Sequence, residues 1–246
     1  MIWAWGASGI GLGLIVGSFV STLVLRWPQQ RDVGGRSCCD ACRERLRWFE
    51  LVPLASFLIA RGRCLRCGAA IDRIHVVGEI LCAVVGGVAF GTAPGIEGLS
   101  AAVAGWLLVA LAMLDVRNFW LPDLLTGLLA IVAVVAAFAG FDPSPLDRLI
   151  GGAVGFLVLA GIALAYRKLR GREVLGGGDP KLFGAIGLWL GWEAQPFVLL
   201  LASLMGLAAA ATMIVRGRVV SATTRLPLGA MLAASAFLWW AAIRAV

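Results

Sequence analysis

The sequence has 246 residues, of which 61% are hydrophobic and only 14% are charged. This apolar content is far above that of water-soluble domains and excludes an ordinary soluble globular protein. The formal net charge is +7. In a membrane protein, excess Arg and Lys mark cytoplasmic loops, so we expect contact with membrane lipid and no binding of nucleic acid.

The apolar stretches are separated by short polar or Gly/Pro breaks. A helix needs about 20 residues to cross the hydrocarbon layer. We therefore expect an all-α polytopic membrane protein with about eight transmembrane helices. The sixth stretch is short for a crossing, which suggests that it starts from a loop dipping into the membrane. In chain order the stretches are 3–25, 76–93, 99–116, 121–140, 147–166, 181–192, 196–215 and 226–245.

The distribution of basic residues predicts the topology. If the amino terminus is outside, the cytoplasmic segments hold 19 of the 21 Arg and Lys residues, as the positive-inside rule requires. We therefore predict a bacterial inner-membrane protein with both termini periplasmic or external. The first stretch has no basic region before it and no small-residue cleavage site, so we expect a retained helix. The cytoplasmic segments are 26–75, 117–120, 167–181 and 216–225.

The chain is expected to have three parts: a first transmembrane helix (1–25), a cytoplasmic insertion (26–75) and a transmembrane core (76–246). The insertion lies between the first and second transmembrane helices and contains two CxxC pairs. Their spacing is typical of two knuckles that bring four thiolates around one tetrahedral Zn²⁺. A four-thiolate site is closed, so the metal would be structural. The expected ligands are Cys39, Cys42, Cys64 and Cys67.

Other roles for these cysteines remain open. Disulfide bonds are one alternative, which the reducing cytoplasm disfavours. Cys38 is another, because it could replace Cys39 as a ligand. His75 is the only histidine of the chain. A His-based catalytic triad or a His-ligated zinc hydrolase is therefore nearly excluded, and His75 is interpreted as a membrane-boundary residue rather than a ligand.

Four carboxylates fall at one membrane level. Glu79, Asp115, Asp123 and Asp179 all lie within about two helical turns of the cytoplasmic boundary, on four different stretches. A carboxylate in or near hydrocarbon costs several kcal/mol and usually faces a cavity with a function. Two such groups can share a proton and activate a water for attack on a peptide carbonyl, with one acting as general base and the other as general acid.

Each aspartate also has a structural alternative. Asp123 and Asp179 stand beside prolines where helices are expected to begin, so either could offset the positive end of a helix dipole or cap a helix. Asp115 lies at the carboxyl end of its helix, where the dipole disfavours an anion. A structural role for Asp115 would depend on pairing with Arg117 or another neighbour.

Short motifs follow one another along nearly the whole chain: Gly17-Ser-Phe19 with Arg26 and Pro28, the CxxC pairs, Leu51-Val-Pro-Leu54, Arg61-Gly-Arg-Cys64, Glu79, Leu114-Asp115, Leu121-Pro-Asp123, Gly176-Gly-Gly-Asp179 and Lys181-Leu182. In these motifs, and above all in their order and spacing, the sequence resembles the prepilin peptidases, or type IV leader peptidases, within the GxGD membrane aspartyl proteases.

The resemblance implies that Asp115 and Asp179 are the catalytic pair. It implies cleavage of type IV pilin-like or pseudopilin precursors, in pilus assembly or type II secretion, and N-methylation of the new amino terminus with S-adenosylmethionine. Supporting roles are expected for Glu79, Asp123, Gly176, Gly178 and Lys181. The glycine run would let the backbone approach an extended substrate closely.

Two alternative functions agree less well with the sequence. A zinc-knuckle transporter or scaffold without hydrolytic activity would place polar residues midway along several helices, and the sequence shows few there. Presenilin-like cleavage within a span conflicts with the boundary position of both aspartates. We therefore expect a membrane aspartic endopeptidase.

Overall fold

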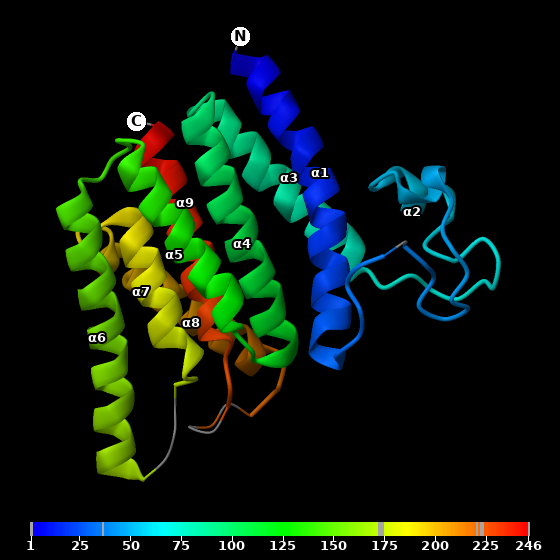
Figure 1. Cartoon of the computed structure of the whole chain (residues 1–246). Coiled ribbons are helices and arrows are strands. Elements are labelled where there is room, and N and C mark those ends of the chain that lie inside the picture. Colours follow the sequence, from blue (N-terminus) through cyan, green and yellow to red (C-terminus); the bar gives the residue numbers. More distant parts are fainter. Residues whose placement is uncertain (1, 36, 172–174, 220, 222–223, 246) are drawn as a thin grey trace. The chain divides into compact units, whose positions relative to one another are not determined.

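The computed structural model describes residues 2–35, 37–171, 175–219, 221 and 224–245 (Figure 1). In this described part the chain is helical and contains no β-strand, only two isolated bridges. The chain divides into two compact units, unit 1 (Met1–Gly98) and unit 2 (Leu99–Val246). Each unit is described separately below.

Unit 1 is built on two long helices, α1 (Ile2–Arg26) and α3 (Ile74–Thr92), which pack closely along their lengths. Small residues on one face of α1 permit this approach. A Cβ added at Gly13 would lie 2.1 Å from the carbonyl oxygen of Cys82, and one at Gly9 would lie 2.2 Å from that of Gly86. Glycines four residues apart let two membrane helices approach to backbone contact.

The insertion between α1 and α3 holds only short helices: η1 (Trp27–Gln29), η2 (Trp48–Leu51) and α2 (Ala55–Ile59). Its two CxxC knuckles fold alike. In each, the residue after the second cysteine has a positive φ, 61° at Arg43 and 72° at Gly68. Its N–H donates to the carbonyl of the first cysteine at 2.9 Å in both knuckles. The insertion is thus shaped by local turns and not by a large apolar core.

Unit 2 contains most of α4 (Ile96–Asn118) and five further helices. Short helix α7 packs mainly against α6 and α5, and α9 packs against α8 and α7. Figure 1 shows α4, α5, α6 and α7 running alongside one another. The further helices are α5 (Asp123–Phe138), α6 (Pro145–Arg170), α7 (Gly178–Leu190), α8 (Gln195–Val215) and α9 (Leu228–Ala245).

Two features hold α7 in place. A Cβ at Gly187 would lie 2.2 Å from the carbonyl oxygen of Gly151, so α6 and α7 are in backbone contact. At the far end of α7, the buried guanidinium of Arg148 donates to the carbonyls of Leu188 and Trp189, and also to carbonyls of the α5 end and the α5–α6 loop. A buried charge is tolerated when its donors are satisfied in this way.

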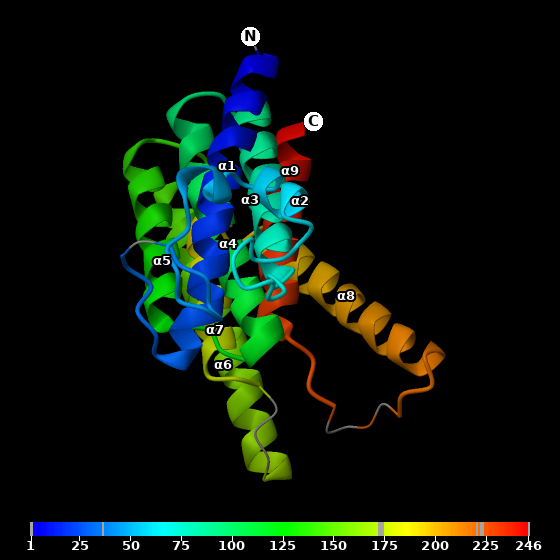
Figure 2. The ribbon, with the colours of Figure 1, turned by 90° about the vertical axis from the view of Figure 1, so that its right-hand side faces the viewer.

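Helix α8 diverges from the rest of unit 2, as Figure 2 shows. Its buried residues are Gln195, Val198 and Ala202, all in its first half. The second half is apolar and exposed, with Leu207 at 68% and Val215 at 87% relative exposure. Such a surface is suited to lipid rather than to water.

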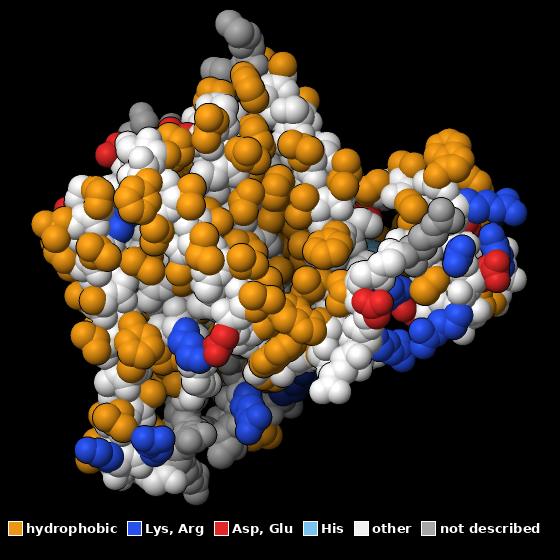
Figure 3. All heavy atoms as spheres, in the orientation of Figure 1, with side chains coloured by type: hydrophobic (Ala, Val, Ile, Leu, Met, Phe, Trp, Pro, Cys, Tyr) orange, Lys and Arg blue, Asp and Glu red, His pale blue; other side chains and the backbone are white. Residues whose placement is uncertain are grey.

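The expected all-α polytopic fold is confirmed, and each of the eight expected stretches coincides with a helix. Within the described residues, five helices, α1, α3, α4, α6 and α8, are long and apolar enough to span a membrane, while α5 and α9 are shorter. Helix α7, the expected sixth span, has only 13 residues. The visible face of α4, α5 and α6 is covered with hydrophobic side chains, and Lys and Arg gather at the lower end of α6 (Figure 3). The chain is a multi-pass membrane protein.

Candidate functional site

Asp115 lies in the last turn of α4 and is buried, with 5% relative exposure. Its Oδ2 accepts a hydrogen bond of 2.8 Å from the N–H of Ala230, in the first turn of α9. The N–H of Gly229 also bonds to this carboxylate. Asp115 therefore stabilises the positive end of α9, although its own helix disfavours an anion at that position.

Asp179 lies in the first turn of α7 and has 7% relative exposure. The N-cap of α7 is Gly177, and no side chain caps this helix. Asp179 is thus not the N-cap residue that its proline neighbour suggested. Its Oδ2 accepts the N–H of Gly176 at 3.0 Å, and its own N–H donates to the carbonyl of Gly176. The glycine run therefore folds back on the carboxylate.

Leu121 lies against the start of α7, which carries Asp179, and against the start of α9, whose N–H groups hold the carboxylate of Asp115. A Cβ at Gly178 would lie 2.7 Å from the Cβ of Leu121, and one at Gly229 would lie 2.7 Å from its Cδ1 and 3.0 Å from Oδ2 of Asp115. The two carboxylates are also close enough for the charge of Asp115 to act on Asp179. Unit 2 thus brings together the ends of α4, α7 and α9 around two buried carboxylates.

Asp123 differs from this pair. Its side chain is 72% exposed and forms an ion pair with Lys181 at 2.7 Å. This contact joins the first turns of α5 and α7 at the surface. Exposed ion pairs typically contribute at most about 1 kcal/mol, so this pair is a weak surface link between α5 and α7.

Glu79, the fourth boundary carboxylate, belongs to unit 1. It lies in α3 with 6% relative exposure, and its Oε2 accepts the N–H of Leu54 at 2.7 Å. Leu54 has a φ of 56°, which is strained for a residue with a branched side chain. Glu79 therefore fixes an unusual turn of the insertion against α3.

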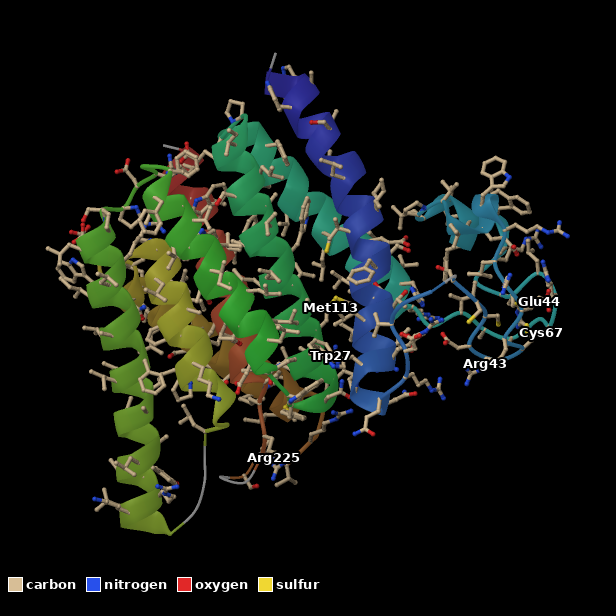
Figure 4. The ribbon with its side chains drawn as sticks, viewed as in Figure 1. Trp27, Arg43, Glu44, Cys67, Met113 and Arg225 are labelled. Atoms are coloured by element: carbon tan, nitrogen blue, oxygen red, sulfur yellow. The ribbon has the colours of Figure 1, made fainter. Side chains whose placement is uncertain are left out.

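The insertion gathers the four sulfur atoms of Cys39, Cys42, Cys64 and Cys67 within 4.8 Å of one another. The Sγ atoms of Cys39 and Cys67 are 3.9 Å apart. Four thiolates at about 2.3 Å from one Zn²⁺ in a tetrahedron would be about 3.8 Å apart, so this sulfur set fits such an ion. Figure 4 shows Arg43, Glu44 and Cys67 close together here, and Glu44 forms an ion pair with Arg66.

The thiols of the cluster hold their protons unequally. Backbone N–H groups of Cys67 and Arg66 lower the pKa of the Cys64 thiol to about 7, whereas the pKa of the Cys42 thiol is raised to about 11, against the backbone hydrogen bond of Glu44, by burial and by the other three cysteines. A thiol must lose its proton to ligate a metal. Cys38 is placed apart from the cluster, with its Sγ 3.7 Å from the guanidinium of Arg26.

Sequence reasoning missed Leu121 as a contact and Gly229 and Ala230 as the partners of Asp115. Pro227, just before α9, is a signal for a helix start. Nothing in a linear sequence shows that this start meets the end of α4. That pairing depends on the tertiary fold.

Fold and site together define a multi-pass helical membrane protein with paired carboxylates at helix ends and a cluster of four cysteines with the spacing of metal ligands. Residues 12–92 match the bacterial peptidase A24 N-terminal domain, and residues 102–211 match the type IV leader peptidase family. No solved structure matches the chain.

Among curated relatives, the prepilin leader peptidase/N-methyltransferase of Aeromonas hydrophila is 42% identical over 172 residues, which is 70% of this chain and 59% of the relative. That of Dickeya chrysanthemi is 35% identical over 241 residues, covering 83% and 81% of the two chains. That of Stutzerimonas stutzeri is 31% identical over 256 residues, covering 93% and 88%. The chain belongs to the type IV leader peptidase family, and the sequence-based resemblance is confirmed.

Proposed function

We propose that the protein is a membrane aspartic endopeptidase that removes the leader peptide of type IV prepilins or pseudopilins at the cytoplasmic boundary of the inner membrane. Both termini would be periplasmic. The observation that carries this proposal is the pair of buried carboxylates, Asp115 and Asp179, at the ends of helices that meet at Leu121. The rival function of a non-catalytic transporter or scaffold gains no support from the curated relatives.

In the proposed reaction the two aspartates share one proton. The ionised carboxylate takes a proton from a water, whose oxygen attacks the scissile carbonyl, and the protonated one supplies the proton that the leaving amine needs. Each carboxylate already accepts backbone N–H groups through Oδ2, which holds its orientation and leaves other lone pairs for water and substrate. The apparent pKa values would belong to the pair and not to either residue.

The glycine run from Gly176 to Gly178 gives an extended substrate close access to Asp179. No described heavy atom outside the immediate neighbours lies within 4 Å of a Cβ added at Gly177, whereas one at Gly178 meets Leu121. One side of the turn is therefore open and the other is packed. Asp123 and Lys181 would hold the first turn of α7 in this position.

The four-cysteine cluster would hold a structural Zn²⁺. The sulfur spacing fits tetrahedral coordination, and a closed four-thiolate site leaves no position for a substrate. A piece of chain this small has little core of its own, so the metal would supply its folding free energy. The cluster would then shape the insertion rather than take part in cleavage.

The second proposed activity is N-methylation of the newly exposed amino terminus, because the relatives are named both as peptidases and as N-methyltransferases. S-adenosylmethionine would supply the methyl group. This activity needs a binding site for a charged nucleotide-like molecule, and the sequence carries no glycine-rich nucleotide fingerprint of Rossmann type.

Mass spectrometry of a co-expressed pilin-like precursor tests both activities together. The precursor should lose the mass of its leader, and the mature protein should gain the mass of one CH2 unit, because a methyl group replaces one hydrogen. An unprocessed precursor beside correctly inserted full-length protein would reject the peptidase proposal. A cleaved but unmethylated product would reject only the methylation part.

A further inference from the structure

The insertion of unit 1 exposes large apolar side chains on two of its short helices, η2 and α2. Trp48, Leu58 and Ile59 have relative exposures of 80%, 73% and 77%. The two helices contact each other, so these side chains lie on neighbouring parts of one surface. We call these three residues the apolar patch. A cluster of exposed apolar side chains marks contact with a membrane or with another protein.

The inner side of α2 has a different environment. Ser56 and Phe57 line a cavity that α1 and α3 also border. A Cβ added at Gly62 would lie 3.0 Å from the ring of Phe57, so this ring packs against the turn that follows α2. Leu58, the next residue, is exposed. The apolar residues of α2 are therefore more numerous than its packing inside unit 1 requires.

A hydrogen bond fixes the depth of α2 along α3. Leu54, the N-cap residue of α2, donates its N–H to Oε2 of Glu79 at 2.7 Å. Glu79 is five residues beyond Ile74, where α3 begins, which corresponds to about 7.5 Å along the helix axis. On the predicted topology α3 runs from the cytoplasm into the membrane, so α2 starts on the membrane side of that helix end. Amphipathic segments at an interface bury their apolar face to a similar depth, about 5–10 Å.

The loops of the cysteine cluster extend in the other direction. Figures 1 and 2 show α2 nearer to the N-terminal end of α1 than the loops below it. Those loops carry Glu44 and Cys67, which Figure 4 labels. Figure 3 shows hydrophobic side chains gathered at the upper end of the insertion and Arg side chains lower down. The insertion thus has an apolar side toward the membrane and a charged side toward the cytoplasm.

The charge of the insertion favours an anionic surface. Residues 26–75 contain ten arginines and five acidic residues. Arg47 directly precedes Trp48, and Arg61 follows Ile59 by two residues, so arginines flank the apolar patch in the chain. The guanidinium of Arg47 lies 5.9 Å from the ring centroid of Phe49. Arginine places its apolar stem along such a surface and its charged end in the headgroup layer, where anionic lipids attract it.

We propose that the apolar patch inserts into the cytoplasmic leaflet of the membrane, and that Arg47 and Arg61 bind phosphates of anionic phospholipids there. The insertion is then an interfacial domain that rests on the bilayer, with Trp48 at the headgroup level that tryptophan favours. The inference needs the predicted cytoplasmic side of the insertion, but it does not depend on the proposed peptidase activity.

Photo-cross-linking of the full-length chain in nanodiscs tests this contact. The photoreactive residue p-benzoylphenylalanine replaces Leu58 or, in a second preparation, Trp48, in bilayers of equal parts phosphatidylcholine and phosphatidylglycerol. Intact-mass spectrometry after irradiation should show the chain with one phospholipid added. Glu44, whose side chain is 56% exposed, is the control position. We expect about tenfold less adduct there, because its loop lies outside the bilayer.

The lipid preference tests the two arginines. Arg47→Gln combined with Arg61→Gln should keep the adduct at Leu58 but lower the ratio of phosphatidylglycerol to phosphatidylcholine adducts about threefold. Arg43→Gln combined with Arg66→Gln removes the same charge from the cysteine loops and should leave this ratio unchanged. Resistance of the insertion to proteinase K shows that each variant is folded.

Three results would overturn the proposal. The first is no lipid adduct at either patch position, or as much adduct at Glu44 as at Leu58 and Trp48. The second is a cross-link from the patch to a co-reconstituted pilin-like precursor or to another part of the chain in place of lipid, because the patch would then be a protein contact. The third is the same ratio in both arginine pairs, which would remove the role of Arg47 and Arg61.

Discussion

The carboxylate of Asp115 accepts a hydrogen bond of 2.8 Å from the backbone N–H of Ala230, which joins the end of α4 to the start of α9. Asp179 is held in a similar way by the N–H of Gly176. Both groups are therefore oriented by backbone donors. Such donors do not titrate and need little reorganisation, which suits carboxylates that must exchange one proton between them.

Gly178→Ala should reduce cleavage strongly, and much more than Gly177→Ala. A Cβ at Gly178 would lie 2.7 Å from the Cβ of Leu121, which forces α7 away from α4 and α9. Overpacking of this kind costs about 1–3 kcal/mol. Gly177 has a φ of −62° and an added Cβ there would have open space. Initial rates on a pilin-like precursor in membranes check the pair, and equal rates for the two variants would contradict the packing described here.

Gly13→Ala should destabilise unit 1, and Gly11→Ala should leave it unchanged. The first substitution puts a Cβ 2.1 Å from the Cys82 carbonyl, while a Cβ at Gly11 meets nothing within 4 Å. We expect a loss of about 1–3 kcal/mol for Gly13→Ala, measured as the free energy of unfolding in detergent. Equal stability of the two variants would show that α1 and α3 do not pack through this face.

Replacing two nearby cysteines should affect the zinc content of the proposed metal site differently. Cys42→Ser removes a ligand and should lower the zinc content from about one ion per chain towards zero. Cys38→Ser should keep the zinc, because Cys38 lies against Arg26 and outside the cluster. Elemental analysis of purified protein gives the answer. Zinc retained by Cys42→Ser and lost by Cys38→Ser would mean that the cluster uses Cys38.

Breaking the ion pair between Asp123 and Lys181 should have only a small effect. Both side chains are largely exposed, at 72% and 48%, so the pair contributes at most about 1 kcal/mol. Lys181→Met should therefore slow cleavage by no more than about fivefold. A loss as large as that of a catalytic residue would place Lys181 in contact with the substrate or with the reacting carboxylates.

The sequence alone predicts the helices well, because apolar stretches bounded by Gly, Pro and charged residues leave few alternatives in a membrane. Even the short sixth stretch appears as a short helix, α7. Glycines inside an apolar span are typical of close helix contact, and Gly13 packs on α3 in this way.

The tertiary partners were not predictable. Asp115 appeared unfavourably placed at the end of α4, and only the fold shows that the start of α9 supplies its N–H donors. Asp179 appeared to be a helix cap, and only the backbone shows that Gly177 takes that position. The sequence places His75 at a membrane boundary, and only the fold of the insertion shows that His75 lines a cavity.

The most direct test of the proposed catalytic pair is leader removal by Asp115→Asn and Asp179→Asn, each measured alone. Asparagine can still accept the N–H groups of Ala230 and Gly176, so the fold should survive while the shared proton is lost. General acid and base catalysis typically contributes about 10²–10⁴-fold. We predict that each variant, present at the level of the parent and of a control variant, Glu193→Gln in the loop before α8, leaves the precursor at its full mass. Processing by either variant at the parental rate would contradict the account.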